Sequence, residues 1–222
     1  MLLISVQRPL SQSAALSAAP RDTLTDIRAD NPHSSASQEA QNIKPPAITV
    51  DGPIALVGLM GVGKTTVGRR LAKVLGRPFF DSDDEIEQAS GRTVAGYFRD
   101  HGEAAFRDGE RRVIDRLLNE GPTILATGGG AFIHPPTHEM LKERALVVWL
   151  KGDFETIMER VSKKNTRPLL QVPNPRAKMR ELMVEREPLY AQAHITVPVS
   201  KGSHMKTVAK IERALKRYAK KT

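Results

Sequence analysis

One short segment constrains the fold of this chain more than any other: Gly58-Leu59-Met60-Gly61-Val62-Gly63-Lys64-Thr65. It matches the pattern G-x-x-x-x-G-K-[ST], in which glycines let consecutive backbone N–H groups curl around phosphates. An apolar run at 54–57 precedes it directly, and apolar residues at helical spacing follow it over 63–75. The motif needs a strand before it and a helix after it, so this context favours a phosphate-binding loop (P-loop) over a chance glycine-rich turn.

Two side chains at the end of the loop are expected to carry the phosphate chemistry. Lys64 would supply a positive charge to the β- and γ-phosphates of a nucleotide, and the Thr65 hydroxyl would coordinate Mg²⁺. Small-molecule kinases, nucleotide kinases, GTPases and ATPases share such a loop. The loop therefore predicts a nucleotide and leaves the substrate open.

The rest of the chain predicts one α/β domain at 49–222, after a disordered extension at 1–48 that lacks apolar periodicity. Strands are expected at 54–57, 78–81, 123–127, 146–150 and 194–199. Helices are expected near 63–75, 83–101, 103–119, 136–144, 153–161, 175–192 and 204–220. The cationic, proline-bearing segment at 163–175 has no regular apolar spacing and is expected to form a mobile lid, beginning at about 161.

Composition narrows the class of protein. The chain has no cysteine, which excludes disulfides, thiolate catalysis and cysteine-ligated zinc, and fits a reducing compartment. No apolar run reaches about 18 residues, and no secretory signal is expected, so we expect a cytoplasmic protein. The net charge is +9, and residues 201–222 hold six lysines and two arginines against the single Glu212. We interpret this tail as the solvated face of a last helix rather than a nucleic-acid surface, because its tyrosine, Tyr218, shares a helical spacing with the apolar residues Val208, Ile211 and Leu215 and would face the core.

An acidic pair, Asp81 and Asp83, closes the second expected strand. In an extended chain residues two apart face the same side, and the carboxyl edge of a parallel sheet is where ligands bind. One carboxylate would suit a magnesium shell and the other an incoming hydroxyl. A helix cap is the competing interpretation, and the pair alone does not decide between them.

Four further features are candidates for anion or ligand binding. Arg107 lies on one helical stripe with Ile114 and Leu118, where a guanidinium could grip a carboxylate or pair with Glu103 or Glu110. The remaining three are a run of three glycines, an arginine in the lid and an arginine in a late helix: Gly128–Gly130, Arg167 and Arg186. A flexible turn is the alternative for the three glycines, and a solvated helix charge is the alternative for Arg186.

The order and spacing of these motifs resemble shikimate kinase over roughly residues 52–200. The resemblance rests on the P-loop, Asp81-Ser82-Asp83, Phe106-Arg107, Gly128-Gly129-Gly130, Arg167-Pro168-Leu169-Leu170 and Glu185-Arg186-x-Pro188-Leu189-Tyr190. It implies a three-layer P-loop kinase fold: a five-stranded parallel sheet with helices on both faces and a moving lid. It also implies transfer of the ATP γ-phosphate to the 3-hydroxyl of shikimate, in aromatic amino acid biosynthesis.

The resemblance also implies a role for each matching position. Catalysis would fall to Lys64, Asp83 and Arg167. Mg²⁺ would be held by Thr65 and Asp81. Shikimate would be bound by Asp83, Arg107, Gly128, Gly129, Gly130 and Arg186. ATP would be contacted by Gly61, Val62, Gly63, Lys64, Thr65, Thr66, Arg160 and Arg167, with Arg160 against the adenine.

Two rival functions stay open on the sequence. A gluconate-type sugar-acid kinase would share the P-loop and an acidic substrate, although the acidic pair, triple glycine and paired arginines are not expected together there. A non-catalytic module that binds ATP or nucleic acid would have no need for acidic residues beside the phosphate site. We expect a monomeric kinase that uses ATP, Mg²⁺ and shikimate, and that binds neither nucleic acid nor membrane.

Overall fold

The computed structural model describes residues 49–162, 168–170, 172–199 and 201–221. Its centre is a five-stranded parallel sheet in the order β2-β3-β1-β4-β5. The strands are β1 (Ile54–Val57), β2 (Phe79–Asp81), β3 (Ile124–Ala126), β4 (Leu146–Gly152) and β5 (Ile195–Val199). β1, β3 and the first five residues of β4 are buried and uniformly apolar, as expected for strands covered on both faces. All five strands lie where the sequence predicted them, within two residues at each end.

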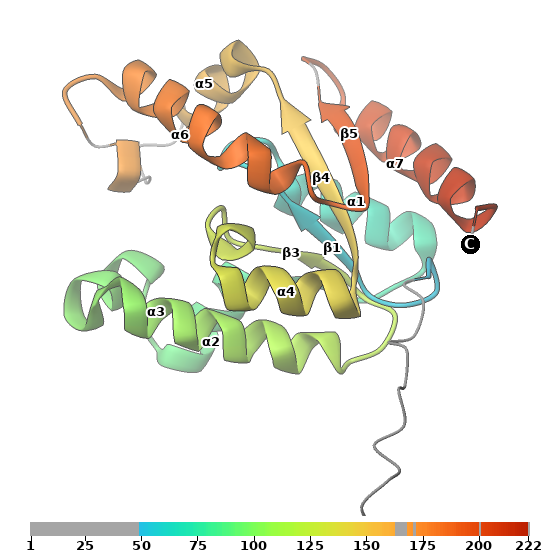
Figure 1. The fold of residues 1–222 in the computed structure, drawn as a ribbon, viewed down its shortest axis with the longest axis horizontal. Coiled ribbons are helices and arrows are strands. Elements are labelled where there is room, and N and C mark those ends of the chain that lie inside the picture. Colours follow the sequence, from blue (N-terminus) through green and yellow to red (C-terminus); the bar gives the residue numbers. More distant parts are fainter. Residues whose placement is uncertain (1–48, 163–167, 171, 200, 222) are drawn as a thin grey trace, which may run out of the picture. The chain divides into compact units, whose positions relative to one another are not determined.

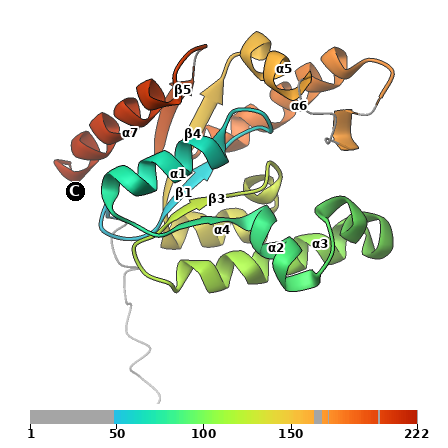
Figure 2. The same ribbon diagram turned by 180° about the vertical axis from the view of Figure 1, so that it is seen from behind.

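Helices cover both faces of the sheet, so the predicted three-layer α/β fold is confirmed (Figure 1). One face carries α1 (Lys64–Leu75) and α7 (His204–Ala219), which pack on it through residues such as Leu71 and Ile211. The other face is covered by α3 (Val94–Leu118), α4 (Pro135–Arg144), α5 (Phe154–Ser162) and α6 (Pro175–Tyr190). Figure 2 shows α1 and α7 side by side from behind.

The basic last helix docks as its spacing predicts. Val208, Ile211 and Leu215 of α7 are buried against the sheet, and Tyr218 packs beside them. Its lysines and arginines at 206, 213, 216, 217 and 220 lie on the exposed side. The apolar stripe thus explains why this basic helix packs on the sheet.

The single helix predicted at 83–101 is wrong. α2 (Ser82–Ser90) ends at Gly91, which adopts a left-handed conformation with φ 65°, and α3 begins after Thr93, whose side chain accepts from the Gly96 N–H. A glycine C-cap followed by a threonine N-cap separates the two helices, although the apolar residues on both sides keep a helical spacing.

α3 itself is kinked at Gly102, at the boundary that the sequence predicted between two helices. Gly102 has φ 78° and ψ 172°, a backbone region that only glycine enters readily. Across the kink the rings of Phe98 and Phe106 stack with centroids 4.2 Å apart, which fixes the angle between the two segments.

His194 links the two last strands and gives a pH dependence to stability. Its Nδ1 accepts a hydrogen bond of 2.9 Å from the backbone N–H of Val147 in β4, so the bound ring is neutral. Burial and, secondarily, Lys142 hold the pKa of His194 below its usual value. The unfolded chain therefore takes up this proton more readily than the folded one, and the contribution is lost as pH falls below about 6.5.

We therefore expect His194→Asn to lose less stability on acidification than the parent chain. The difference between the two proteins in the free energy of unfolding should shrink by about 1 kcal/mol between pH 7.5 and pH 5.5, the worth of one hydrogen bond. Denaturant titrations at both pH values measure it. Parallel pH curves for the two proteins would contradict this role.

None of the helices among the described residues combines the length and the apolar composition needed to cross a bilayer.

Candidate functional site

The P-loop, Gly58–Thr65, joins β1 to α1 at the carboxyl edge of the sheet. Gly58, Gly61 and Gly63 have φ of 135°, 78° and 99°, which L side chains rarely adopt. Lys64 is buried and donates to two carbonyl oxygens of the loop, of Gly58 at 2.7 Å and of Leu59 at 3.1 Å. The ammonium is therefore held at the mouth of the loop, in the position from which a P-loop lysine contacts phosphates.

Asp81 caps a helix and also contacts the P-loop, so the two interpretations left open by the sequence are compatible. Its Oδ1 accepts from the Asp83 N–H at 3.1 Å and caps α2. Its Oδ2 accepts from the Thr65 hydroxyl at 2.7 Å. The two residues predicted to share Mg²⁺ are thus in direct contact, and both offer the hard oxygen donors that this ion prefers.

Asp83 is not on an extended strand, contrary to the prediction. The Asp81 cap starts α2 at Ser82, so Asp83 lies in the first helical turn. It nevertheless reaches the triple-glycine turn: a Cβ on Gly128 would lie 2.7 Å from Oδ1 of Asp83. Ser82, which the sequence did not single out, fastens the same turn, because its hydroxyl oxygen accepts from the Gly128 N–H at 2.9 Å.

Arg107 lies at the same turn, held by two glutamates. Its Nη1 donates to Oε2 of Glu110 at 2.6 Å, and its Nη2 donates to Oε1 of Glu103 at 3.3 Å. A Cβ on Gly130 would collide with the Arg107 Nη2, so the guanidinium occupies the space that a side chain at this position would take. The intrahelical ion pairs that the sequence offered as an alternative are present, and the guanidinium also faces the site.

Glu110 is a site residue that the sequence raised only as a partner for Arg107. It is fully buried, and burial raises the pKa of Glu110, with Arg107 offsetting this only in part. Its Oε1 has no hydrogen-bond partner among the described residues and would lie 2.7 Å from a Cβ on Gly128. Sequence spacing gave the i,i+3 relation to Arg107 but could not show the burial.

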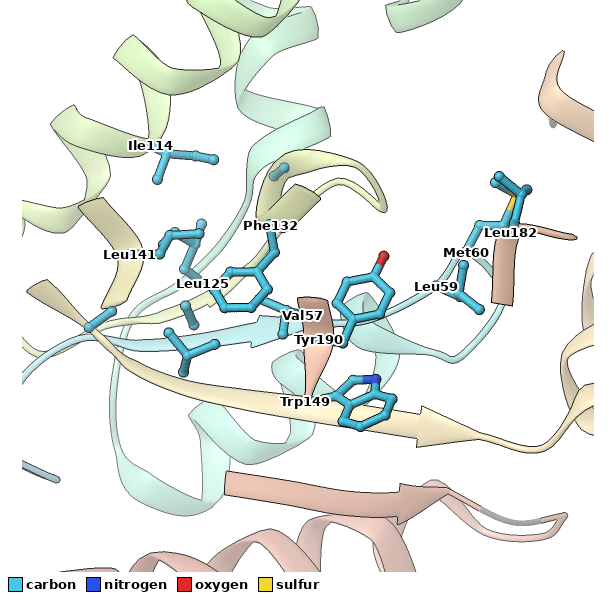
Figure 3. Packing of buried hydrophobic residues seen from close by; sticks show 14 of the residues in the cluster. Val57, Leu59, Met60, Ile114, Leu125, Phe132, Leu141, Trp149, Leu182 and Tyr190 are labelled. Atoms are coloured by element: carbon cyan, nitrogen blue, oxygen red, sulfur yellow. The ribbon is translucent and has the colours of Figure 1, made fainter. Parts of the chain in front are cut away.

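Arg186 and Tyr190 approach the turn from the opposite side, on α6. The carbonyl of Gly129 accepts from Arg186 Nη1 at 3.4 Å and from the Tyr190 hydroxyl at 2.5 Å. Tyr190 lies between Phe132 and Trp149 in the core, as Figure 3 shows, and burial raises the pKa of Tyr190 to about 12. The phenol therefore stays protonated and holds the turn that the two arginines face.

The structure describes some of the residues predicted to contact ATP and not others. Arg160 of α5 lies against the P-loop and donates to the Val62 carbonyl at 2.9 Å. Thr66 is in the first turn of α1, directly after Thr65. Of the predicted lid, Arg167 together with residues 163–166 and 171 lies outside the described residues, so the assignment of Arg167 stays a prediction from the sequence.

Gly61→Ala is expected to weaken ATP binding strongly. A Cβ there would lie 2.5 Å from Val161 Cγ1, so the loop would have to shift in addition to the strain of φ 78°. Gly76→Ala is the matched control, because Gly76 has φ 63° but no atom within 4 Å of an added Cβ. Both should lose about 1–3 kcal/mol of stability to backbone strain. Only Gly61→Ala should raise the KM for ATP, by about tenfold or more, and equal KM values would contradict this.

Comparisons with known proteins point to one family. The family model for shikimate kinase matches residues 60–216. The chain is 52% identical over 163 residues to shikimate kinase of Caulobacter vibrioides, which covers 73% of this chain and 82% of that protein. The solved structure of shikimate kinase from Acinetobacter baumannii in complex with shikimate is 43% identical, with a TM-score of 0.73, over 75% of this chain and 94% of that chain. A gluconokinase from Sinorhizobium meliloti 1021 is 17% identical, with a TM-score of 0.52, over 78% of this chain and 96% of that chain, a likeness in fold alone.

Proposed function

This chain belongs to the shikimate kinase family, and on that premise we propose that it transfers the γ-phosphate of ATP to the 3-hydroxyl of shikimate. As a member of that family it is an ATP-dependent kinase. One observation of the site carries the substrate assignment: Asp83, Arg107 and Arg186 converge on the Gly128–Gly130 turn. An anionic polyol calls for such a set, with arginines for its carboxylate and a carboxylate for its hydroxyls.

The turn also lies next to the P-loop, which brings acceptor and phosphate together. A Cβ on Gly129 would be 3.4 Å from the backbone nitrogen of Met60. A substrate held at the turn would thus present its hydroxyl toward a phosphate in the loop. Positioning of this kind supplies much of the rate enhancement in phosphoryl transfer.

Each residue then has a defined task. Arg107 and Arg186 bind the substrate carboxylate, and the backbone of Gly128–Gly130 fits its ring closely. Asp83 accepts a hydrogen bond from the attacking hydroxyl and orients it. Lys64 transfers its hydrogen bonds from the carbonyls of Gly58 and Leu59 to phosphate oxygens.

Mg²⁺ is proposed to bind at Thr65 and Asp81, because a hydroxyl and a carboxylate oxygen already meet there at 2.7 Å. This ion usually takes only one or two protein oxygens and completes its shell with water and phosphate oxygens. When bound, it supplies neutralisation of phosphate charge. The chain's own contribution is to hold the Thr65 hydroxyl through Asp81.

We further propose a monomeric, cytoplasmic enzyme. The absence of cysteine suits a reducing compartment.

The test is ADP release from ATP and Mg²⁺ with shikimate, with gluconate and with no acceptor. We expect turnover that depends on shikimate. Turnover with gluconate alone would overturn the substrate and keep the kinase. Silence with every acceptor, together with salt-sensitive DNA binding, would favour a binding module.

A further inference from the structure

One buried hydroxyl contacts the triple-glycine turn without taking part in the proposed chemistry. Tyr190, the last residue of α6, is 1% exposed, and its hydroxyl donates to the Gly129 carbonyl oxygen at 2.5 Å. The same oxygen accepts from Nη1 of Arg186 at 3.4 Å. Two side chains of α6 therefore share one acceptor, in the turn at which the substrate is proposed to bind.

The two donors hold this carbonyl unequally. The bond from the phenol is short for any hydrogen bond, whereas 3.4 Å exceeds the usual N–H···O range of about 2.7–3.2 Å. The Gly129 carbonyl is therefore satisfied mainly by Tyr190. Nε of Arg186 is buried and has no hydrogen-bond partner among the described residues. The guanidinium thus rests at the turn with donor capacity left for another acceptor.

Packing fixes the phenol where it is. The ring of Tyr190 lies between Phe132 and Trp149, with centroids 6.4 Å and 6.0 Å away and interplanar angles of 6° and 24° (Figure 3). Phe132 lies two residues after the last glycine of the turn. Tyr190 therefore contacts the turn with its hydroxyl and the residues that follow the turn with its ring.

Helical spacing brings the guanidinium to the same carbonyl. Arg186 and Tyr190 are four residues apart on α6, so their side chains lie on one side of the helix. Without the phenol hydroxyl, the Gly129 carbonyl would lose its strong donor, and a poorly satisfied buried acceptor is costly. Arg186 already reaches this oxygen, so the guanidinium would be drawn to it and away from a ligand.

We propose that Tyr190 is a positioning residue for the acceptor substrate: by satisfying the Gly129 carbonyl, it keeps the Arg186 guanidinium available for the substrate carboxylate. This role rests on the proposed function, in which Arg186 binds that carboxylate. It makes the phenol a determinant of affinity for shikimate and leaves the chemical step to other residues.

Tyr190→Phe tests the role, because it keeps the stacked ring and removes only the hydroxyl. Steady-state kinetics should show the KM for shikimate raised by about tenfold, the worth of one hydrogen bond. The values of kcat and of the KM for ATP should stay within about twofold, as for a loss of uniform binding. Tyr218→Phe, at a tyrosine of α7 on the other face of the sheet, is the matched control and should behave as the parent chain. An unchanged KM for shikimate in Tyr190→Phe would overturn the proposal.

A double-mutant cycle with Arg186→Ala separates positioning from a general effect on the fold. If Tyr190 acts through Arg186, then Tyr190→Phe should change the KM for shikimate by less than about twofold once Arg186 is alanine. A rise of the same factor in both backgrounds would show that the hydroxyl does not act through Arg186, and would overturn the role.

NMR of the ligand-free protein gives a readout that needs no turnover. The Nε–H resonance of Arg186, identified by its absence from Arg186→Ala, should shift in Tyr190→Phe and stay in place in Tyr218→Phe. An unshifted resonance in Tyr190→Phe would overturn the positioning role even where shikimate-dependent turnover stands. A parent chain that released no ADP with shikimate would count instead against the proposed function.

Discussion

Asp83→Asn is expected to reduce kcat by about 10²–10⁴-fold while leaving ATP affinity nearly intact. The asparagine keeps the size of the side chain but loses the charge that is proposed to orient the attacking hydroxyl. Its backbone N–H still donates to Asp81, so the α2 cap and the contact of Asp81 with Thr65 remain. Steady-state kinetics and ADP titration measure the two effects separately.

Asp84→Asn is the matched control for this change. Asp84 is the next residue of the same helical turn, but it is exposed and pairs with Arg69 at 3.2 Å. Its loss should leave kcat within about twofold, because exposed ion pairs contribute little. A turnover for Asp83→Asn close to that of Asp84→Asn would remove Asp83 from the mechanism.

Arg107→Ala is expected to raise the KM for shikimate by roughly 100-fold, as for other buried charges that lose a partner. The change removes one of the two groups proposed to bind the carboxylate and leaves Glu110 buried without its 2.6 Å ion pair. The protein should therefore also lose stability, by about 3 kcal/mol. Arg112→Ala, an exposed arginine of α3 paired with Asp108, should change neither quantity.

A double variant separates the two consequences of losing Arg107. Arg107→Ala with Glu110→Gln removes the uncompensated charge, so the free energy of unfolding should recover toward that of the parent chain. The KM for shikimate should stay high, because no guanidinium has been restored. If the free energy of unfolding and the KM for shikimate both recovered, Arg107 would affect substrate binding only by stabilising the fold.

Most of the fold followed from the sequence, because its signals are local. Buried strands appear in the sequence as apolar runs. The P-loop pattern predicted the bounds of the first strand and the first helix to within one residue. The helix at 83–101 was wrong because its apolar spacing continues through Gly91 and Thr93. There the backbone conformation of one glycine and one capping side chain ended one helix and began another.

The site was less predictable, because its geometry depends on contacts between distant segments. The sequence found Asp81, Arg107 and Arg186 as separate candidates, and their order along the chain grouped them into one set. It could not show that Glu110 is fully buried or that Tyr190 fixes the Gly129 carbonyl. Both facts arise only when α3 and α6 pack on the same face of the sheet.

The two glutamates on Arg107 have unequal freedom, and this affects how an anion would bind. The Glu110 side chain has no exposed surface, whereas that of Glu103 is 71% exposed. A substrate carboxylate that bound Arg107 as proposed would therefore replace Glu103, which can turn into water, while Glu110 would stay paired. This replacement would leave the number of carboxylates paired with the guanidinium unchanged. A simple anion with no other contacts would therefore gain little binding affinity there. Selectivity then depends on the shape of the ligand and its hydroxyls, and binding should respond only weakly to salt.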